Sequence, residues 1–286
     1  MTLSERPETV TNPPTIWANG RLFQDPDEAT VSVRDHGLVV GDGVFEALKV
    51  TKAGPFAVRR HLLRMDRSAA VMGLPAPDHR LIRGGIDAVL AGHSFELGKI
   101  RITYTGGLGP LGSGAAYGPT TLIVAVDAAP PQPPVSNIVT APWTRNERGA
   151  LAGVKSTSYA ENVRALAYAT DRGASESIFA NTAGQLCEGT GTNIFCVFGN
   201  EVVTPPLSCG ALAGITRELV LEWADVVERD ISMTEAMSAD EVFVTSSLRD
   251  VQGVTTWDDT TFSAARPVTD RLARVFAERS GADLDP

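Results

Sequence analysis

One lysine, Lys155, stands in a setting that could make its side chain reactive. The 286-residue chain has only four lysines, and this one follows a small apolar run, residues 149–154. The next stretch has a helical pattern whose apolar face would carry Tyr159, Val163, Leu166 and Ala167. Burial there would disfavour the ammonium, lower the pKa of the amine and make it a nucleophile. The alternative is a surface lysine with its stem on the protein and its amine in water.

A buried amine nucleophile implies a carbonyl partner, and a carboxylate further along indicates what else that partner carries. Glu188 lies in Gln185-Leu-Cys-Glu-Gly-Thr-Gly-Thr-Asn193, at the exit of a turn among small residues that let a ligand approach closely. A carboxylate there could pair with a protonated ring nitrogen. A solvated turn acid is the alternative.

The stretch Leu212-Ala-Gly-Ile-Thr216 precedes an amphipathic helix and could bind an anion. The free backbone N–H groups around Gly214 and Ile215, together with the Thr216 hydroxyl, would form the site. An ordinary helix cap is the commoner use of such a sequence.

Ser246 and Ser247 follow a predicted strand, and Arg64 lies on the first predicted helix. Both residue types bind phosphate well, although either could simply lie on the surface. An amine, an acid and several phosphate-binding groups together require a ligand with an aldehyde, a basic ring nitrogen and a phosphate. Pyridoxal 5′-phosphate has these three features.

The stretch Gly107-Leu-Gly-Pro-Leu-Gly112 matches the dinucleotide-binding pattern only in its letters. Pro110 and the small residues after it do not open a helix, and no acid follows on a second strand at the required distance. We expect a mobile loop near the substrate instead.

Composition narrows the function further. The net charge of −9 argues against nucleic acid or an anionic membrane as a partner, and no apolar run is long enough to span a bilayer. The four histidines have no metal-ligand spacing, so we expect no metal. The three cysteines look like reduced thiols, and residues 1–14 lack a signal-peptide pattern, which together predict a cytoplasmic protein.

Strand and helix patterns mix in both halves of the chain, which predicts an α/β (mixed α+β) fold with two lobes. The proline-rich stretch 128–135 is the clearest linker, since proline keeps the backbone stiff and extended. We therefore expect a disordered tail (1–14), an N-terminal domain (15–127) and a C-terminal cofactor-binding domain (136–286). Other expectations are an Asn-Gly hairpin at 15–23, a strand at 29–33, and helices at 61–72, 78–90 and from 214 through Val227.

The motifs and their order along the chain resemble those of the fold-type IV (class IV) pyridoxal-phosphate enzymes. This family includes branched-chain and D-amino-acid aminotransferases, (R)-amine transaminases and aminodeoxychorismate lyases. The resemblance covers about Trp17 to the end of the chain. It implies that Lys155 is the Schiff-base lysine, Glu188 the acid on the pyridine nitrogen and Arg64 the phosphate arginine. It places the other cofactor contacts at Tyr159, Gly214, Ile215, Thr216, Ser246 and Ser247.

The resemblance also implies at least a homodimer, with the cofactor between the lobes and an amine or amino acid and a keto acid as substrates. Phe45 falls where some D-amino-acid enzymes carry a carboxylate-binding tyrosine, but phenylalanine has no hydroxyl. Arg101 could hold a substrate carboxylate instead, or face solvent. We expect an aminotransferase that uses Lys155. The alternatives are a 4-amino-4-deoxychorismate lyase, which would release pyruvate and 4-aminobenzoate, and a cofactor-binding protein without turnover.

Overall fold

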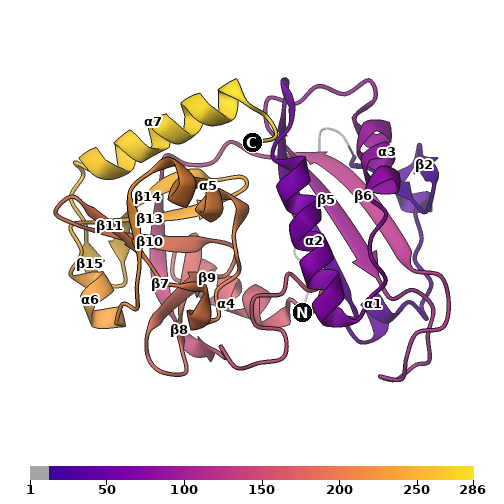
Figure 1. The fold of residues 1–286 in the computed structure, drawn as a ribbon, viewed down its shortest axis with the longest axis horizontal. Coiled ribbons are helices and arrows are strands. Elements are labelled where there is room, and N and C mark those ends of the chain that lie inside the picture. The colour runs from indigo at the N-terminus through magenta and orange to yellow at the C-terminus, as the bar shows by residue number, and fades with distance from the viewer. Residues whose placement is uncertain (1–12) are drawn as a thin grey trace, which may run out of the picture.

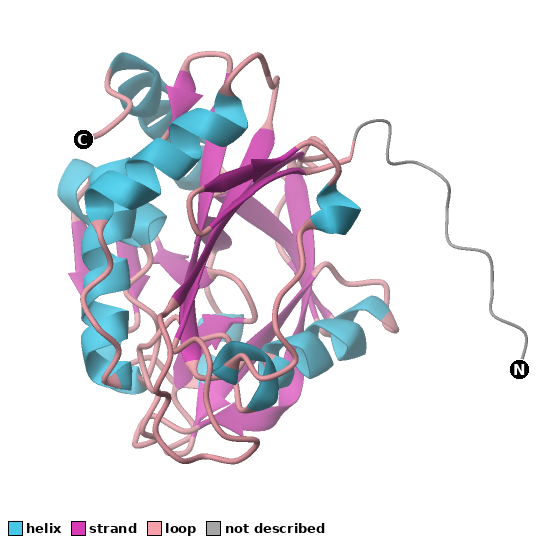
Figure 2. Cartoon of the chain, turned by 90° about the vertical axis from the view of Figure 1, so that its right-hand side faces the viewer, coloured by secondary structure: helices cyan, strands magenta, loops and turns pink. Residues whose placement is uncertain are grey.

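A computed structural model describes residues 13–286, which form two β-sheets with helices around them (Figure 1). Most of the predicted tail, residues 1–12, lies outside the described residues. The first half of the chain, indigo to magenta, builds one sheet, and the second half, magenta to yellow, builds the other. Figure 2 shows the strands crossing the middle of the molecule with the helices on the outside. This is the predicted mixed α/β fold with two lobes.

The first sheet has six strands in the order β2-β1-β6-β5-β3-β4, all antiparallel. Its strands are β1 (Thr15–Ala18), β2 (Arg21–Phe23), β3 (Gly43–Thr51), β4 (Gly54–Pro55), β5 (Gly98–Thr105) and β6 (Thr121–Ala128). The predicted hairpin is confirmed, because Asn19 and Gly20 turn between β1 and β2 with φ of 48° and 91°. These positive angles are those that Asn-Gly turns favour.

Helices α2 (Val58–Met72) and α3 (His79–Leu90) pack on one face of this sheet. Asp78 caps α3 by accepting hydrogen bonds from two backbone N–H groups, and Gly73 ends α2 with φ of 72°. Alternation along β3 places Val44, Glu46 and Leu48 toward α2, so the opposite face carries Phe45 and Lys49. That second face is turned toward the other half of the chain.

The second sheet has nine strands, in the order β12-β11-β10-β13-β14-β7-β8-β9, with β15 paired to β14. Its strands are β7 (Val135–Arg145), β8 (Glu176–Asn181), β9 (Leu186–Gly189), β10 (Asn193–Phe198), β11 (Glu201–Thr204), β12 (Val226–Glu228), β13 (Glu241–Ser246), β14 (Asp250–Trp257) and β15 (Thr260–Thr261). The predicted hairpin across Gly199-Asn200 is confirmed as β10–β11.

The helices of the second half are α4 (Ala160–Thr170), α5 (Ile215–Trp223), α6 (Met233–Met237) and α7 (Pro267–Ala282). Phe276 of α7 contacts Phe56 of the first half, with ring centroids 6.1 Å apart. Phe56 and Ala57 also share a buried cluster with residues of β10, α5 and α7. This shared apolar core joins the two lobes.

Residues 129–134 connect β6 with β7 and so pass from one sheet to the other. The division of the chain into two domains at this linker stays a prediction. Within residues 13–286, no helix combines the length and apolar character that crossing a membrane requires.

Three details of the predicted elements are wrong. Residues 29–33 form no strand: they follow a short 3-10 helix, η1 (Pro26–Glu28), and leave Val31 and Val33 exposed before α1 (His36–Val39). Helix α5 ends at Trp223, because Ala224 is already extended and Val226 and Val227 belong to β12, which pairs with β11. The third error concerns α4.

The apolar face predicted for α4 is not the buried face. Val163 is 63% and Leu166 41% exposed, whereas Asn162, Ala165 and Ala169 are buried. Small side chains let the helix approach β7 and β8 closely, and Asn162 finds hydrogen-bond partners beneath it. The helical period was correct, but the sequence alone did not show which face is covered.

Candidate active site

A cavity of about 880 Å³ lies between the two halves of the chain. Nine of the predicted site residues line it: Arg64, Lys155, Tyr159, Glu188, Gly214, Ile215, Thr216, Ser246 and Ser247. They come from α2, the loop before α4, β9, the start of α5 and the turn after β13. The fold therefore brings together residues as far as 183 positions apart in the sequence. Their chemical roles stay predictions.

Lys155 is held by the backbone on either side of its side chain. The Phe45 N–H donates to the Lys155 carbonyl (3.0 Å) and the Lys155 N–H donates to Ser68 Oγ (3.3 Å). The Thr157 N–H donates to the Gly43 carbonyl (2.8 Å), so this loop runs along the start of β3. The backbone thus fixes where the amine enters the cavity.

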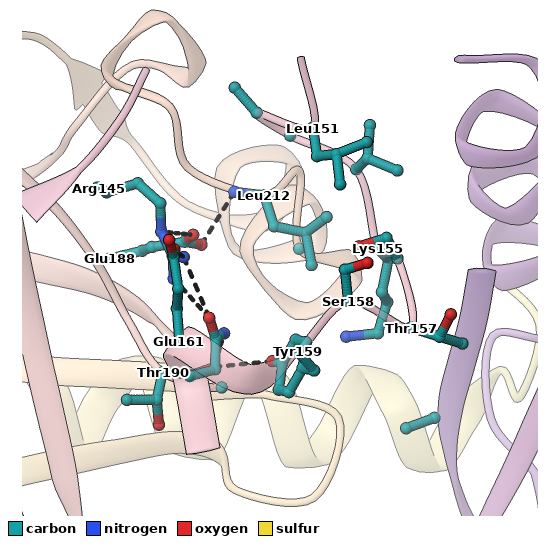
Figure 3. A pocket seen from close by; sticks show the side chains of 18 of the residues that line it. Arg145, Leu151, Lys155, Thr157, Ser158, Tyr159, Glu161, Glu188, Thr190 and Leu212 are labelled. Atoms are coloured by element: carbon teal, nitrogen blue, oxygen red, sulfur yellow. Dashed lines mark hydrogen bonds and ion pairs between the residues drawn. The ribbon is translucent and has the colours of Figure 1, made fainter. Parts of the chain in front are cut away.

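The Lys155 amine lies over the Phe45 ring, 4.4 Å from its centroid. Burial, and then repulsion from Arg64, lower the pKa of the amine from 10.5 to about 8. At neutral pH a much larger fraction is therefore the neutral, nucleophilic amine than in an exposed lysine. The expectation of a desolvated lysine is met, and Figure 3 shows its side chain reaching into the same space as Glu188 from the opposite wall.

Phe45 and Arg101 are not among the residues that line the cavity. The Phe45 ring instead contacts the Lys155 amine and also the guanidinium of Arg101 on strand β5, whose carbon lies 3.9 Å from the ring centroid. The side chain of Arg101 also donates to Thr103 Oγ1 (3.2 Å). Phe45 is buried and Arg101 is exposed, and both lie near Lys155 without lining the cavity.

Glu188 is buried on β9 with two polar neighbours. Its Oε2 accepts a hydrogen bond from the Leu212 N–H (2.9 Å), and its Oε1 lies 3.3 Å from Arg145 Nε (Figure 3). Burial raises the pKa of Glu188 above its ordinary value, while Arg145 and the Leu212 N–H act in the opposite direction. Its carboxyl group therefore lines the cavity in a place where burial and nearby groups act in opposite directions on its charge.

Arg64 is held by a buried carboxylate, Glu46, which was not among the predicted site residues. Glu46 accepts hydrogen bonds from Arg64 Nε (2.8 Å) and Nη2 (2.6 Å), and its Oε2 lies 2.7 Å from His61 Nδ1. Burial alone would raise the pKa of Glu46, but Arg64 and His61 lower it to about 2. The remaining nitrogen of Arg64, Nη1, donates to the Ala213 carbonyl (2.9 Å) at the cavity wall.

The turn before α5 is bound on three sides. Glu188 accepts from the Leu212 N–H, Asn193 Nδ2 donates to the Leu212 carbonyl (2.9 Å), and Arg64 bonds Ala213. Gly214 is the helix N-cap and has no side chain to bond the first N–H groups of α5. A Cβ at Gly214 would lie 1.9 Å from Asn193 Oδ1, so glycine is required by close packing. An uncapped helix N-terminus held this way favours an anion.

Ser246 is the last residue of β13 and Ser247 begins the turn before β14. Beside them the buried Thr245 hydroxyl, which also lines the cavity, has no hydrogen-bond partner within the described residues. Asp250, which begins β14 directly after this turn, is bound to Lys49 of β3 at 2.6 and 2.7 Å. An ion pair between the lobes therefore positions this turn.

Tyr159 packs edge-on against Phe45, with ring centroids 5.2 Å apart. Its hydroxyl donates to the Thr190 carbonyl (2.7 Å), which also accepts from Asn162 Nδ2 (2.5 Å). The Gly189–Thr192 turn beside it is held by Glu176, whose carboxylate accepts from the Thr190 and Gly191 N–H groups. Tyr159 and Glu188 thus belong to one rigid wall.

A family model described as amino-transferase class IV matches residues 43–257. The chain belongs to the class IV aminotransferases. Three curated relatives of this class IV aminotransferase carry different names. This chain is 32% identical to a putative branched-chain-amino-acid aminotransferase of Methanocaldococcus jannaschii, over 82% of this chain and 85% of the relative. It is 27% identical to a D-alanine aminotransferase of Bacillus licheniformis (88% and 91%) and 26% identical to an aminodeoxychorismate lyase of Bacillus subtilis (82% and 84%).

Solved structures of class IV aminotransferases share this fold. The branched-chain aminotransferase of Thermoproteus uzoniensis with norvaline has a TM-score of 0.86 at 26% identity, covering 92% of this chain and 93% of that one. A hypothetical aminotransferase of Mycobacterium tuberculosis in its pyridoxal-phosphate-bound form has a TM-score of 0.82 at 25% identity, covering 92% and 97%. The two-lobe, fold-type IV architecture expected from the sequence is confirmed.

Four polar residues of this class IV aminotransferase site were missed in the sequence: Glu46, Arg145, Asn162 and Asn193. Glu46 follows Phe45 and Asn193 ends the stretch Gln185–Asn193, so their proximity to predicted site residues was an available signal. Asn162 lies close to Lys155 and Tyr159 in the sequence, but no motif marks Arg145, and only the packing of α4 on β7 brings Arg145 and Asn162 together. The loop 106–118, all of which is described, does not line the cavity. It packs on α1 through His36, whose Nε2 lies 3.1 Å from the Pro110 carbonyl.

Residues 13–286 contain no group of three or more His, Cys, Asp or Glu side chains that could hold a metal ion.

Proposed function

We propose that this class IV aminotransferase binds pyridoxal 5′-phosphate in the cavity and moves an amino group between an amino acid or (R)-amine and a 2-keto acid. The observation that carries this proposal is a desolvated amine, Lys155, facing the same cavity as a buried carboxylate, Glu188. When bound, the cofactor stabilises the negative charge that develops on the substrate carbon.

The residues present fit this cofactor. A cavity of about 880 Å³ has room for it and a substrate. The uncapped start of α5 at Gly214–Thr216, Arg64 and the turn at Ser246–Ser247 would hold the phosphate, and the unpaired Thr245 hydroxyl lies beside that turn. Glu188 would face the ring nitrogen and Tyr159 the phenolic oxygen.

Lys155 would hold the cofactor through its amine and, once released by the substrate, move a proton at the substrate carbon. Its lowered pKa suits both tasks, since the neutral amine is the nucleophile and the base. Glu188 would keep the ring nitrogen protonated, which lets the ring accept negative charge. Phe45 lies against the amine, and Arg101, which contacts Phe45 but does not line the cavity, would attract a substrate carboxylate through its charge.

The first test is the substitution Lys155→Ala, with Lys99→Ala on the exposed side of β5 as the matched control. We expect Lys155→Ala to lose the visible absorbance of the bound cofactor and the covalent adduct seen by mass spectrometry after borohydride reduction. Turnover should fall by about 10²–10⁴-fold or more, while Lys99→Ala behaves like the wild type. Normal turnover by Lys155→Ala would end the assignment.

A lyase reaction is the second candidate, because one relative is named an aminodeoxychorismate lyase. The two reactions differ in their need for an acceptor. A lyase releases pyruvate from 4-amino-4-deoxychorismate without an added keto acid, whereas an aminotransferase consumes one. A donor panel of D-alanine, branched-chain L-amino acids and (R)-1-phenylethylamine, each with a keto acid, would identify the substrate. A protein that binds the cofactor and turns over none of these would be a binding protein.

We also propose a homodimer whose partner closes the cavity. Apolar side chains are exposed around its mouth and on α4: Leu38, Val40, Leu151, Val163 and Leu166. Exposed apolar groups gathered in this way mark interaction surfaces. The cytoplasm is the proposed location, since Cys187, Cys196 and Cys209 are free thiols in the structure.

A further inference from the structure

A basic residue outside the predicted motifs, Arg145, stands directly behind Glu188. Its Nε lies 3.3 Å from Glu188 Oε1, at the end of β7 (Figure 3). Among residues 13–286 this buried nitrogen has no hydrogen-bond partner. Its influence on Glu188 is therefore mainly that of a nearby positive charge.

Groups other than Glu188 hold Arg145 in place. Its guanidinium stacks on Phe179, 4.3 Å from the ring centroid, and Nη1 and Nη2 both donate to Asn162 Oδ1, at 3.1 and 3.0 Å. The side chain is only 14% exposed. Because Phe179 contacts the face of the guanidinium and Asn162 binds its end, the position of Arg145 is set independently of Glu188. The Glu188 carboxyl group therefore lies beside a fixed positive charge.

Asn162 extends this restraint to the opposite end of the site. Its amide Nδ2 donates to the Thr190 carbonyl, which also accepts from the Tyr159 hydroxyl. One connected set of side chains therefore runs from the acid predicted to face the ring nitrogen to the tyrosine predicted to face the phenolic oxygen.

Two influences compete at the Glu188 carboxyl group. Burial favours its neutral form, and Arg145 comes first among the groups that favour the carboxylate, before the Leu212 N–H and Lys155. Glu176 acts with burial. The other titratable groups nearby are Tyr159, Cys187 and Cys209, together with the exposed Glu161, whose Oε2 lies 3.5 Å from Arg145 Nη1.

We propose that Arg145 is a positioning residue that holds Glu188 as a carboxylate directed at the cofactor's ring nitrogen, with Asn162 tying this arrangement to Tyr159. This inference rests on the proposed function. A single proton shared between Glu188 and the ring nitrogen can reside on either atom, and the fixed charge of Arg145 favours the nitrogen. Without Arg145 the proton would move toward Glu188, and the ring would accept negative charge less well.

The test compares Arg145→Gln with Arg148→Gln, because Arg148 lies three residues further on with its side chain 88% exposed. In cofactor-free protein carrying ¹³C-labelled glutamate, the Glu188 signal is assigned from Glu188→Gln and titrated by NMR. We expect its midpoint to rise by about 1–3 pH units in Arg145→Gln and to stay unchanged in Arg148→Gln. Pyridoxal phosphate should bind Arg145→Gln about tenfold or more weakly, and Arg145→Lys should restore part of both properties.

An unchanged midpoint in Arg145→Gln, or an equal rise in Arg148→Gln, would overturn the inference. If Arg145→Gln does not fold, Asn162→Ala replaces it. This variant keeps the charge of Arg145 but removes the side chain that binds its guanidinium. A Glu188 midpoint and a cofactor affinity like those of the wild type would then overturn the inference. Failure of the proposed function looks different, since the wild type would then not take up pyridoxal phosphate, whereas the Glu188 titration needs no cofactor.

Discussion

Single residues in this protein acquire their chemistry from burial and from one or two charged neighbours. Lys155 and Glu188 are both shifted toward their neutral forms by burial, and both have a fixed arginine nearby, Arg64 and Arg145. Arg64 acts with burial on Lys155 and favours the neutral amine, whereas Arg145 opposes burial on Glu188 and favours the carboxylate. Glu46 is the contrasting case, because it is buried but remains charged.

The stability of the protein should depend on Glu46 in acid. Its pKa is lowered from 4.5 to about 2, mainly because Arg64 outweighs the effect of burial. The stabilisation is therefore complete above about pH 4.5 and is lost as the pH falls toward about 2. The shift corresponds to about 3 kcal/mol, so Glu46→Gln should lower the free energy of unfolding by about that amount at neutral pH.

Urea unfolding at a series of pH values measures this effect. Between pH 4.5 and 2 the stability of Glu46→Gln should fall less steeply than that of the wild type. Glu96→Gln, at an exposed position, is the control and should leave the curve unchanged. A curve for Glu46→Gln parallel to the wild type over this range would show that Glu46 carries no such shift.

At the scale of elements, short connections between strands and helices build the site. The turn before α5 takes its shape from Glu188, Asn193 and Arg64, which come from β9, β10 and α2. Adding a single atom to this turn should therefore disturb the packing of β9, β10 and α2 together.

Gly214→Ala tests this tight packing. The added Cβ would lie 1.9 Å from Asn193 Oδ1, so the turn or Asn193 must move. We expect a loss of about 1–3 kcal/mol in the free energy of unfolding and weaker binding of pyridoxal phosphate. Gly84→Ala in α3, where no atom lies within 4 Å, should be neutral or stabilising by up to about 1 kcal/mol. Equal behaviour of the two variants in denaturation and cofactor titration would contradict the packing argument.

At the scale of the whole molecule, two sheets share a core through Phe56 and α7, and the Lys49–Asp250 pair links β3 to the start of β14. The cavity between them is open on a side where apolar groups are exposed. This opening is the reason to expect a second copy of the chain.

The proposed dimer can be tested on α4. Val163→Glu combined with Leu166→Glu places two charges on its exposed apolar face without weakening the helix. If α4 lies in the interface, the double variant should be a monomer by light scattering, with little activity. Leu81→Glu, an equally exposed position on α3, is the control and should remain a dimer. A dimeric double variant would exclude α4 from the interface.

The sequence by itself determined the order of the motifs around Lys155, Glu188 and Gly214, most helices and strands, and the family. These are local properties, set by residue type and spacing along a few turns or one strand. It did not determine which face of α4 is buried or that α5 stops at Trp223, because those depend on what packs against them.

Only the tertiary structure decided the partners of the reactive groups. Arg145 lies 43 residues from Glu188, and Glu46 lies 18 residues from Arg64, yet each pair is within about 3 Å in the fold. No local pattern marks such pairs, since their meeting follows from how β7, α4 and β9, or β3 and α2, pack together. Charge and burial at a site are therefore properties of the folded chain.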